Sequence, residues 1–194
     1  MTPPTALDLP AVDPLPEATA RYFDLCQKKL GLVPNVLRAY AHDIGKLDAF
    51  TAFYDQVMLA ESALSKLERE MIAVVVSAEN QCHYCLVAHG AALRSLSGRP
   101  DWAETLATNW RMAALSPRET AMLTFAVKVT RQSAEIGDLD RDALRDVGFA
   151  DADIWDIAAV AGFFAMSNRL ASATGMRPNP EYFAQARRRR FSRF

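Results

Sequence analysis

The feature that most constrains the fold is a pair of helix-start motifs, each followed by a long stretch of helical spacing. Ser65-Lys66-Leu67-Glu68 and Ser116-Pro117-Arg118-Glu119 each place a hydroxyl residue three positions before a glutamate, the pattern of a capping box. The segment Met71 to Val76 after the first motif could also suit a buried strand, because Val74 to Val76 is β-branched. The capped start and the length of the segment favour a helix to about Asn80.

Helical spacing and stop signals cover most of the remaining chain, and no strand pattern is convincing. The other predicted helices are Glu17 to about Leu30, stopped by Gly31; Asn35 to about His42; Leu47 to Ala60; near Cys82 to about Leu96, ended by Gly98 and Pro100; the segment after Ser116 through Val129; Asp140 to Val147; Asp151 to about Thr174; and a last helix after Pro180. No helix is assigned between Pro100 and Ser116. The expected fold is an all-α compact helical bundle.

The 194 residues fit one domain with two short extensions. Residues 1–14, which hold four prolines, are predicted to be an extended arm lying on the body or on a neighbouring subunit. Residues 15–186 form the single all-helical domain. Residues 187–194 form a basic tail that we expect to be solvated or docked on a subunit. The mostly apolar helix after Asp151 is expected to hold a central or interface position.

Charge and hydropathy exclude several function classes. The formal net charge of -1 argues against a nucleic-acid-binding protein, which would carry a large basic excess. No apolar run is long enough to span a bilayer, so no membrane partner is expected. The N-terminus shows no secretory signal, and the expected compartment is the cytoplasm.

Two of the three cysteines, Cys82 and Cys85, form a CxxC motif. A helix that begins near Cys82 would place free backbone N–H groups and its positive dipole end beside both sulfurs, and both effects favour thiolate over thiol. His89 follows Cys85 by four residues and shares its helix face, so an imidazole there could take the thiol proton. A thiolate can attack a peroxide to give a sulfenic acid, which a second thiol converts to a disulfide.

Other interpretations of the same residues stay open. The two cysteines could be buried structural thiols, or zinc ligands together with His89 or His83, although a zinc site usually takes four ligands. Two glutamates, Glu70 and Glu79, precede the CxxC motif, and either could be the functional carboxylate. Cys26 is interpreted as a small core residue. The aromatic residues, including Trp110, Trp155, Phe163 and Phe164, are expected in the core rather than in a substrate pocket.

The segment Cys82-His83-Tyr84-Cys85-Leu86-Val87-Ala88-His89 resembles the Cys-x-x-Cys-x-x-x-His motif of the alkyl hydroperoxidase D-like proteins of the carboxymuconolactone decarboxylase superfamily. Glu70 lies twelve residues before the first cysteine, as in that family. The resemblance extends from about Val33 to Arg177, over Val33-Pro34-Asn35 and Asn168-Arg169-Leu170, and is to a peroxidase-related branch.

The resemblance implies that Cys85 is the peroxidatic cysteine, that Cys82 resolves it, and that Glu70 and His89 relay protons. The family's founding members have a second relay histidine where this chain has Tyr84. A tyrosine can donate a hydrogen bond or hold a water, but it is a poor general base at neutral pH because the ordinary pKa of its hydroxyl is about 10.

The resemblance therefore predicts a thiol-dependent peroxidase that reduces organic hydroperoxides, with no cofactor and no metal. An external dithiol, a lipoyl protein or another thiol protein, would reduce it again. A homo-oligomer is expected, as a dimer, trimer or hexamer. The alternatives are an enzyme of the carboxymuconolactone decarboxylase type, a non-catalytic redox sensor and a metal-binding protein.

Overall fold

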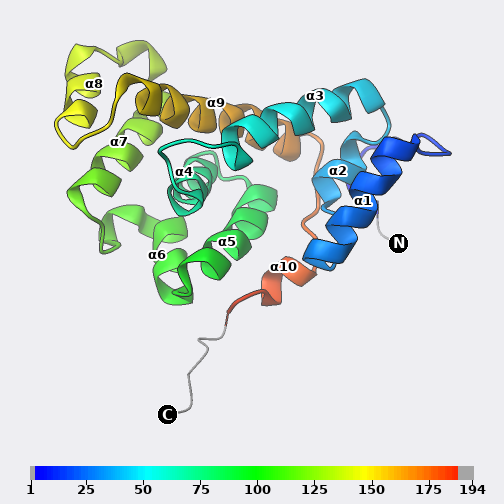
Figure 1. The fold of residues 1–194 in the computed structure, drawn as a ribbon. Helices are drawn as coiled ribbons and strands as arrows, with labels where there is room; N and C mark the ends of the chain where they lie inside the picture. The colour runs from blue at the N-terminus through cyan, green and yellow to red at the C-terminus, as the bar shows by residue number, and fades with distance from the viewer. Residues whose placement is uncertain (1–2, 188–194) are drawn as a thin grey trace.

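The structure, a computed structural model, describes residues 3–187, so the predicted basic tail beyond Arg187 lies outside the described residues. All regular elements within residues 3–187 are helical, which confirms the all-α prediction (Figure 1). The α-helices are α1 (Glu17–Leu30), α2 (Asn35–Tyr40), α3 (Ile44–Tyr54), α4 (Lys66–Glu79), α5 (His83–Ser97), α6 (Pro100–Asn109), α7 (Pro117–Arg131), α8 (Asp138–Arg145), α9 (Asp151–Ala173) and α10 (Glu181–Ala184).

α4 is the central helix of the bundle. Its capping box is complete, with the Ser65 hydroxyl accepting from the Glu68 N–H and the Glu68 carboxylate accepting from the Ser65 N–H. Residues 71–77 are buried on all sides because α5, α6, α7 and α9 pack around α4 (Figure 1). The β-branched run at residues 74–76 is therefore a fully buried helical segment, as predicted. The central position belongs to α4, whereas α9 leaves one face exposed.

Three local predictions were wrong. α6 was missed, because Pro100 occupies the first turn of a new helix, where proline's missing N–H costs nothing, in addition to ending the previous one. α3 begins at Ile44, three residues before the predicted start, because the Asp43 side chain caps it by accepting from the Lys46 N–H. The same helix passes into a π-helical turn over Asp55–Leu59 instead of continuing as an α-helix.

The prediction for the aromatic residues was right in part. Trp110, Phe163 and Phe164 are buried in the core, as is Cys26. Trp155 is 76% exposed, so its assignment to the core was wrong. Its neighbours Ile154 and Ile157 turn inward, and the helical period leaves Trp155 on the outer face of α9.

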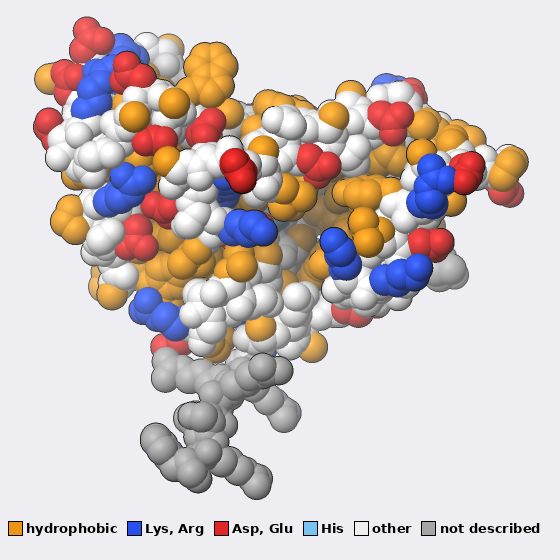
Figure 2. Space-filling model, viewed as in Figure 1, with side chains coloured by type: hydrophobic (Ala, Val, Ile, Leu, Met, Phe, Trp, Pro, Cys, Tyr) orange, Lys and Arg blue, Asp and Glu red, His pale blue; other side chains and the backbone are white. Residues whose placement is uncertain are grey.

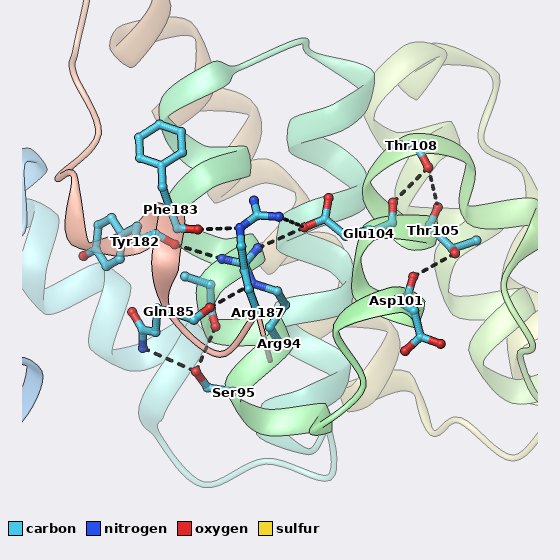
Figure 3. A network of polar contacts seen from close by, with 11 residues as sticks. Arg94, Ser95, Asp101, Glu104, Thr105, Thr108, Tyr182, Phe183, Gln185 and Arg187 are labelled. Carbon is cyan, nitrogen blue, oxygen red and sulfur yellow. Dashed lines mark hydrogen bonds and ion pairs between the residues drawn. The ribbon is translucent and has the colours of Figure 1, made fainter. Parts of the chain in front are cut away.

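Both ends of the described chain are tied to the body. In the N-terminal arm the Ala6 N–H donates to the Thr174 carbonyl, and the Val12 N–H donates to the Ala41 carbonyl. At the other end, Figure 3 shows the guanidinium of Arg94, on α5, bonded to the Tyr182 and Gln185 carbonyls at 2.8 and 3.0 Å. Arg94 and Arg187 also form ion pairs with Glu104 on α6, and together these contacts fix α10 and residues 185–187 against α5 and α6.

None of the helices within residues 3–187 is long and apolar enough to cross a membrane.

Candidate active site

The CxxC motif lies where α4 turns into α5. Gln81, with φ of 52°, makes the turn in a backbone region that non-glycine residues rarely adopt. Cys82 is the N-cap residue of α5, and its N–H donates to the Ser77 carbonyl at 2.9 Å. Cys85 follows in the first turn. Both residues are free thiols and only 1% exposed. The predicted helix start beside Cys82 is confirmed.

The electrostatics favour one negative charge on this pair. The pKa of Cys82 is lowered to about 6, first because the Cys85 thiol hydrogen-bonds to it and then because the Cys85 backbone N–H, Ser172 and Asn168 also stabilise its thiolate. The pKa of Cys85 is raised, because its proton is held by Cys82, because it is buried and because the Cys82 charge repels a second one. The two thiols therefore titrate as a pair that shares one proton at neutral pH.

Glu70 and His89 form the second part of the site. The carboxylate of Glu70, on α4, is hydrogen-bonded to His89 Nδ1, on α5, across 2.8 Å. The His89 ring also stands edge-on to Phe164, with 4.6 Å between ring centroids, so the imidazole is fixed on two sides. Both side chains are largely buried but more exposed than the thiols. The structure thus pairs Glu70 rather than Glu79 with His89, while Glu79 forms an ion pair with Arg131.

Tyr84, which stands where the resemblance has a second relay histidine, contacts the start of α2. Its hydroxyl accepts the Val36 N–H at 3.0 Å, at the start of α2, and its ring is buried. Burial raises its pKa well above the ordinary value for tyrosine. The hydroxyl is thus engaged in holding α2 against α5. A proton-transfer role for Tyr84 stays a prediction.

A polar cluster that sequence reasoning did not assign to the site lies on the other side of the motif. Asn168, on α9, donates to Ser77 Oγ and accepts from Asn80 Nδ2, each at 3.0 Å. Hydrogen bonding by Ser172 contributes to lowering the pKa of Cys82, and hydrogen bonding by Ser167 acts in the same direction on the pKa of Cys85. The available signal was the row of polar residues interrupting a helix that is otherwise apolar.

The other histidine of the motif, His83, is not buried with the thiols. His83 is exposed and faces Phe183, with 6.1 Å between ring centroids, beside a cavity of about 500 Å³ that Gln81 and Trp110 help to line. Within residues 3–187, no group of three or more His, Cys, Asp or Glu side chains could hold a metal ion.

Comparison with known proteins gives two relatives that match nearly the whole chain. An uncharacterised peroxidase-related protein from Silicibacter sp. TM1040 is 64% identical, with a TM-score of 0.93, and the match covers 95% of this chain and 96% of that one. The "alkylhydroperoxidase AhpD core" protein from Ralstonia eutropha JMP134, also described as peroxidase-related, is 44% identical over 98% of this chain and 100% of that one, with a TM-score of 0.93. The chain belongs to the AhpD-like proteins of the carboxymuconolactone decarboxylase superfamily.

The carboxymuconolactone decarboxylase family matches residues 47–128 of this AhpD-like protein, from α3 into α7, a range that includes Glu70, both cysteines of the motif and His89. The debrominase Bmp8 shares the fold at 16% identity and a TM-score of 0.77, over 93% of this chain and 96% of that one. No curated protein matches the sequence. Family and fold thus agree with the resemblance noted in the sequence.

Proposed function

We propose that this AhpD-like protein is a dithiol peroxidase that reduces organic hydroperoxides at Cys82 and Cys85. The observation that carries the proposal is the pair of free thiols at the N-terminus of α5, one turn before His89 on the same helix, with His89 hydrogen-bonded to Glu70 on α4. A thiolate is the reactive form of cysteine, and helix N-termini favour it.

The proposed cycle has three steps. The thiolate attacks one peroxide oxygen, the O–O bond breaks, and the sulfur is oxidised to a sulfenic acid while the alkoxide takes a proton and leaves as an alcohol. The second thiol then displaces water from the sulfenic acid and forms the Cys82–Cys85 disulfide. An external dithiol reduces this disulfide by thiol–disulfide exchange and is itself oxidised to a disulfide.

We propose Cys85 as the attacking cysteine and Cys82 as the resolving one, with His89 and Glu70 moving the proton. Cys85 and His89 are one turn apart on α5. The shared proton can reside on either sulfur, so Cys85 becomes the nucleophile when that proton passes to Cys82. Tyr84, whose hydroxyl already accepts the Val36 N–H, then serves to hold α5 in place.

The direct test measures hydroperoxide consumption with a dithiol reductant for the wild-type protein, Cys82→Ser and Cys85→Ser, with free thiols counted before and after. We expect turnover in the wild-type protein alone. A single addition of peroxide without reductant should convert Cys82→Ser to a trappable sulfenic acid and leave Cys85→Ser unreacted. If Cys85→Ser keeps full turnover, the proposal is wrong.

The same measurements separate the alternatives. A redox sensor would form the disulfide with one equivalent of peroxide but show no sustained turnover with any dithiol. An enzyme of the decarboxylase type would turn over its lactone substrate after both thiols are alkylated. A reaction of the wild-type thiols that is no faster than that of an unperturbed thiol would remove the basis of the peroxidase proposal.

The proposed partners are the external dithiol and further copies of the chain. The outer face of α9 exposes Trp155, Met166 and Leu170, three large apolar side chains that support an interface between copies. Figure 2 shows hydrophobic surface over the parts of the molecule that face the viewer, including a hollow between α1–α3 and α4–α5. We expect light scattering to show an oligomer and Met166→Asp to reduce its mass. An unchanged mass would exclude this face as the interface.

A further inference from the structure

Asn168 is a polar residue in the apolar part of α9, and it is 1% exposed. Ala171 lies three positions later on the same helix face and belongs to the buried cluster that contains Cys82 and Cys85. The side chain of Asn168 is therefore on the face of α9 that is turned toward the CxxC motif. A buried amide is costly unless it is hydrogen-bonded. The surroundings of Asn168 therefore define what the amide does.

Two hydrogen bonds orient the amide. Asn80 Nδ2 donates to Asn168 Oδ1, and Asn168 Nδ2 donates to Ser77 Oγ. Ser77 lies in the last turn of α4 and Asn80 is the C-cap residue of that helix, and the Ser77 carbonyl also accepts the Cys82 N–H. The oxygen end is thus held at Asn80, and the NH2 end is held toward the motif.

An asparagine NH2 group has two hydrogens, and Ser77 takes one of them. Hydrogen bonding by Asn168 acts on both Cys82 and Cys85 and lowers the pKa of each. The residues of α2 and α9 in the cluster around the sulfurs, among them Val36, Ala39 and Ala171, are uncharged. Tyr84 is a further titratable group near the pair, and the Cys85 charge contributes to the raised pKa of Tyr84.

The geometry points to Asn168 as a positioning residue whose second amide hydrogen is shared by the two sulfurs and holds a thiolate on either of them. This inference rests on the proposed dithiol function, because only a pair that changes its charged member needs a donor placed for both. A neutral amide suits that task, since it stabilises a negative charge without pairing permanently with it.

The test is a pH titration of the thiolate by its ultraviolet absorbance, with all variants built on Cys26→Ala so that the third thiol does not contribute. Removing a hydrogen bond to a charged group raises the pKa by about one unit, so Asn168→Ala should move the first titration upward from about 6 by roughly that amount. Asn168→Asp should move it further, because a carboxylate of the same shape repels the thiolate.

The shared character is tested in single-thiol proteins. Asn168→Ala should raise the pKa of the remaining thiol in both the Cys82→Ser and the Cys85→Ser protein. A shift in one of them alone would show a donor dedicated to one sulfur, and no shift in either would remove Asn168 from the site. Both results would overturn the inference.

Asn179→Ala is the matched control, because Asn179 is also a buried asparagine but bonds the Val33 carbonyl and the Asn35 N–H. It should lower stability and leave the thiol pKa unchanged. If Asn168→Ala does not fold, Asn80→Ala keeps the question open to measurement, since it frees the amide oxygen and should give a smaller shift. The titration needs no turnover, so an inactive wild-type protein would count against the peroxidase proposal and not against this one.

Discussion

The two ends of α5 carry buried polar clusters of opposite kinds. At the N-terminal end, Cys82 and Cys85 are surrounded by the neutral groups of Asn168 and the serines of α9. At the C-terminal end, Arg94 is buried with a permanent charge and is bonded to Glu104 and to two carbonyls of the C-terminal segment. The groups of residues 3–187 that stabilise the thiolate are neutral, whereas the second cluster is built around the fixed positive charge of Arg94.

The difference follows from what each cluster must hold. A thiolate appears and disappears during a redox cycle, so a fixed cation beside it would favour one state only, whereas amide and hydroxyl donors tolerate both. Arg94 never loses its charge, and its removal would leave its partners unpaired. The thiol end can therefore change its charge while the Arg94 end keeps the C-terminal segment in place.

The largest expected effect is on the thiol end. His89→Gln should lower peroxide turnover about 100-fold, because a positioned general acid–base group contributes at least that much. His83→Gln is the matched control, since His83 is exposed on the same helix, and it should keep wild-type turnover. Steady-state kinetics with a fixed dithiol measures both. Equal losses in the two variants would contradict the role of His89.

The next effect is on the Arg94 end. Arg94→Met keeps the apolar stem but leaves the Tyr182 and Gln185 carbonyls without their donor, so the free energy of unfolding should fall by about 2–3 kcal/mol. Arg141→Met removes an exposed ion pair with Asp138 and should change stability little. Urea unfolding compares the two. A thiol pKa that stays the same in Arg94→Met would show that the ends of α5 act independently.

Tyr84→Phe tests whether Tyr84, which lies between the two cysteines in the sequence, has a structural role or a role in proton transfer. It should cost about 1–2 kcal/mol of stability, because the Val36 N–H loses its acceptor, and it should keep most of the peroxide turnover. Thermal unfolding and kinetics on the same preparation separate the two. A loss of turnover much greater than the loss of folded protein would make Tyr84 part of the proton relay.

The smallest expected effect is a dependence of stability on pH in the reduced protein. The pKa of Cys82 is lowered from 9.0 to about 6 in the folded state, so between these values the unfolded chain binds more protons and stability rises with pH. The rise between pH 6 and about pH 7 should be about 1 kcal/mol. The second proton of the thiol pair stays bound in both the folded and the unfolded state over this interval and contributes nothing. Chemical unfolding of Cys82→Ser should lack the rise.

The fold was predictable where short local rules decide it. The capping boxes at Ser65 and Ser116 and the glycine at position 31 fixed helix boundaries, because caps depend on residues close in sequence. α6 was missed because Pro100 both ends and begins a helix. Trp155 was misplaced because α9 is apolar on two faces, and only the tertiary packing decides which of them is covered.

The site was predictable along one helix and not between helices. The i to i+4 relation of Cys85 and His89 follows from the sequence alone, and the family resemblance pointed to Glu70, which the structure pairs with His89. Asn168 is eighty-three residues beyond Cys85, and no local spacing connects the two. The acceptor role of the Tyr84 hydroxyl depended likewise on where α2 packs.

The C-terminal segment has a consequence for how the protein can be handled and how it could be regulated. Arg94 bonds the Tyr182 and Gln185 carbonyls, and Asn179, just before α10, bonds Val33 and Asn35 at the start of α2. The N–H of Val36, also on α2, donates to the Tyr84 hydroxyl within the CxxC motif. These bonds form a closed chain of supports that begins and ends on α5. We therefore expect a truncation, a bulky tag or a bound partner at the C-terminus to change how readily reagents reach the buried thiols, although it touches neither sulfur.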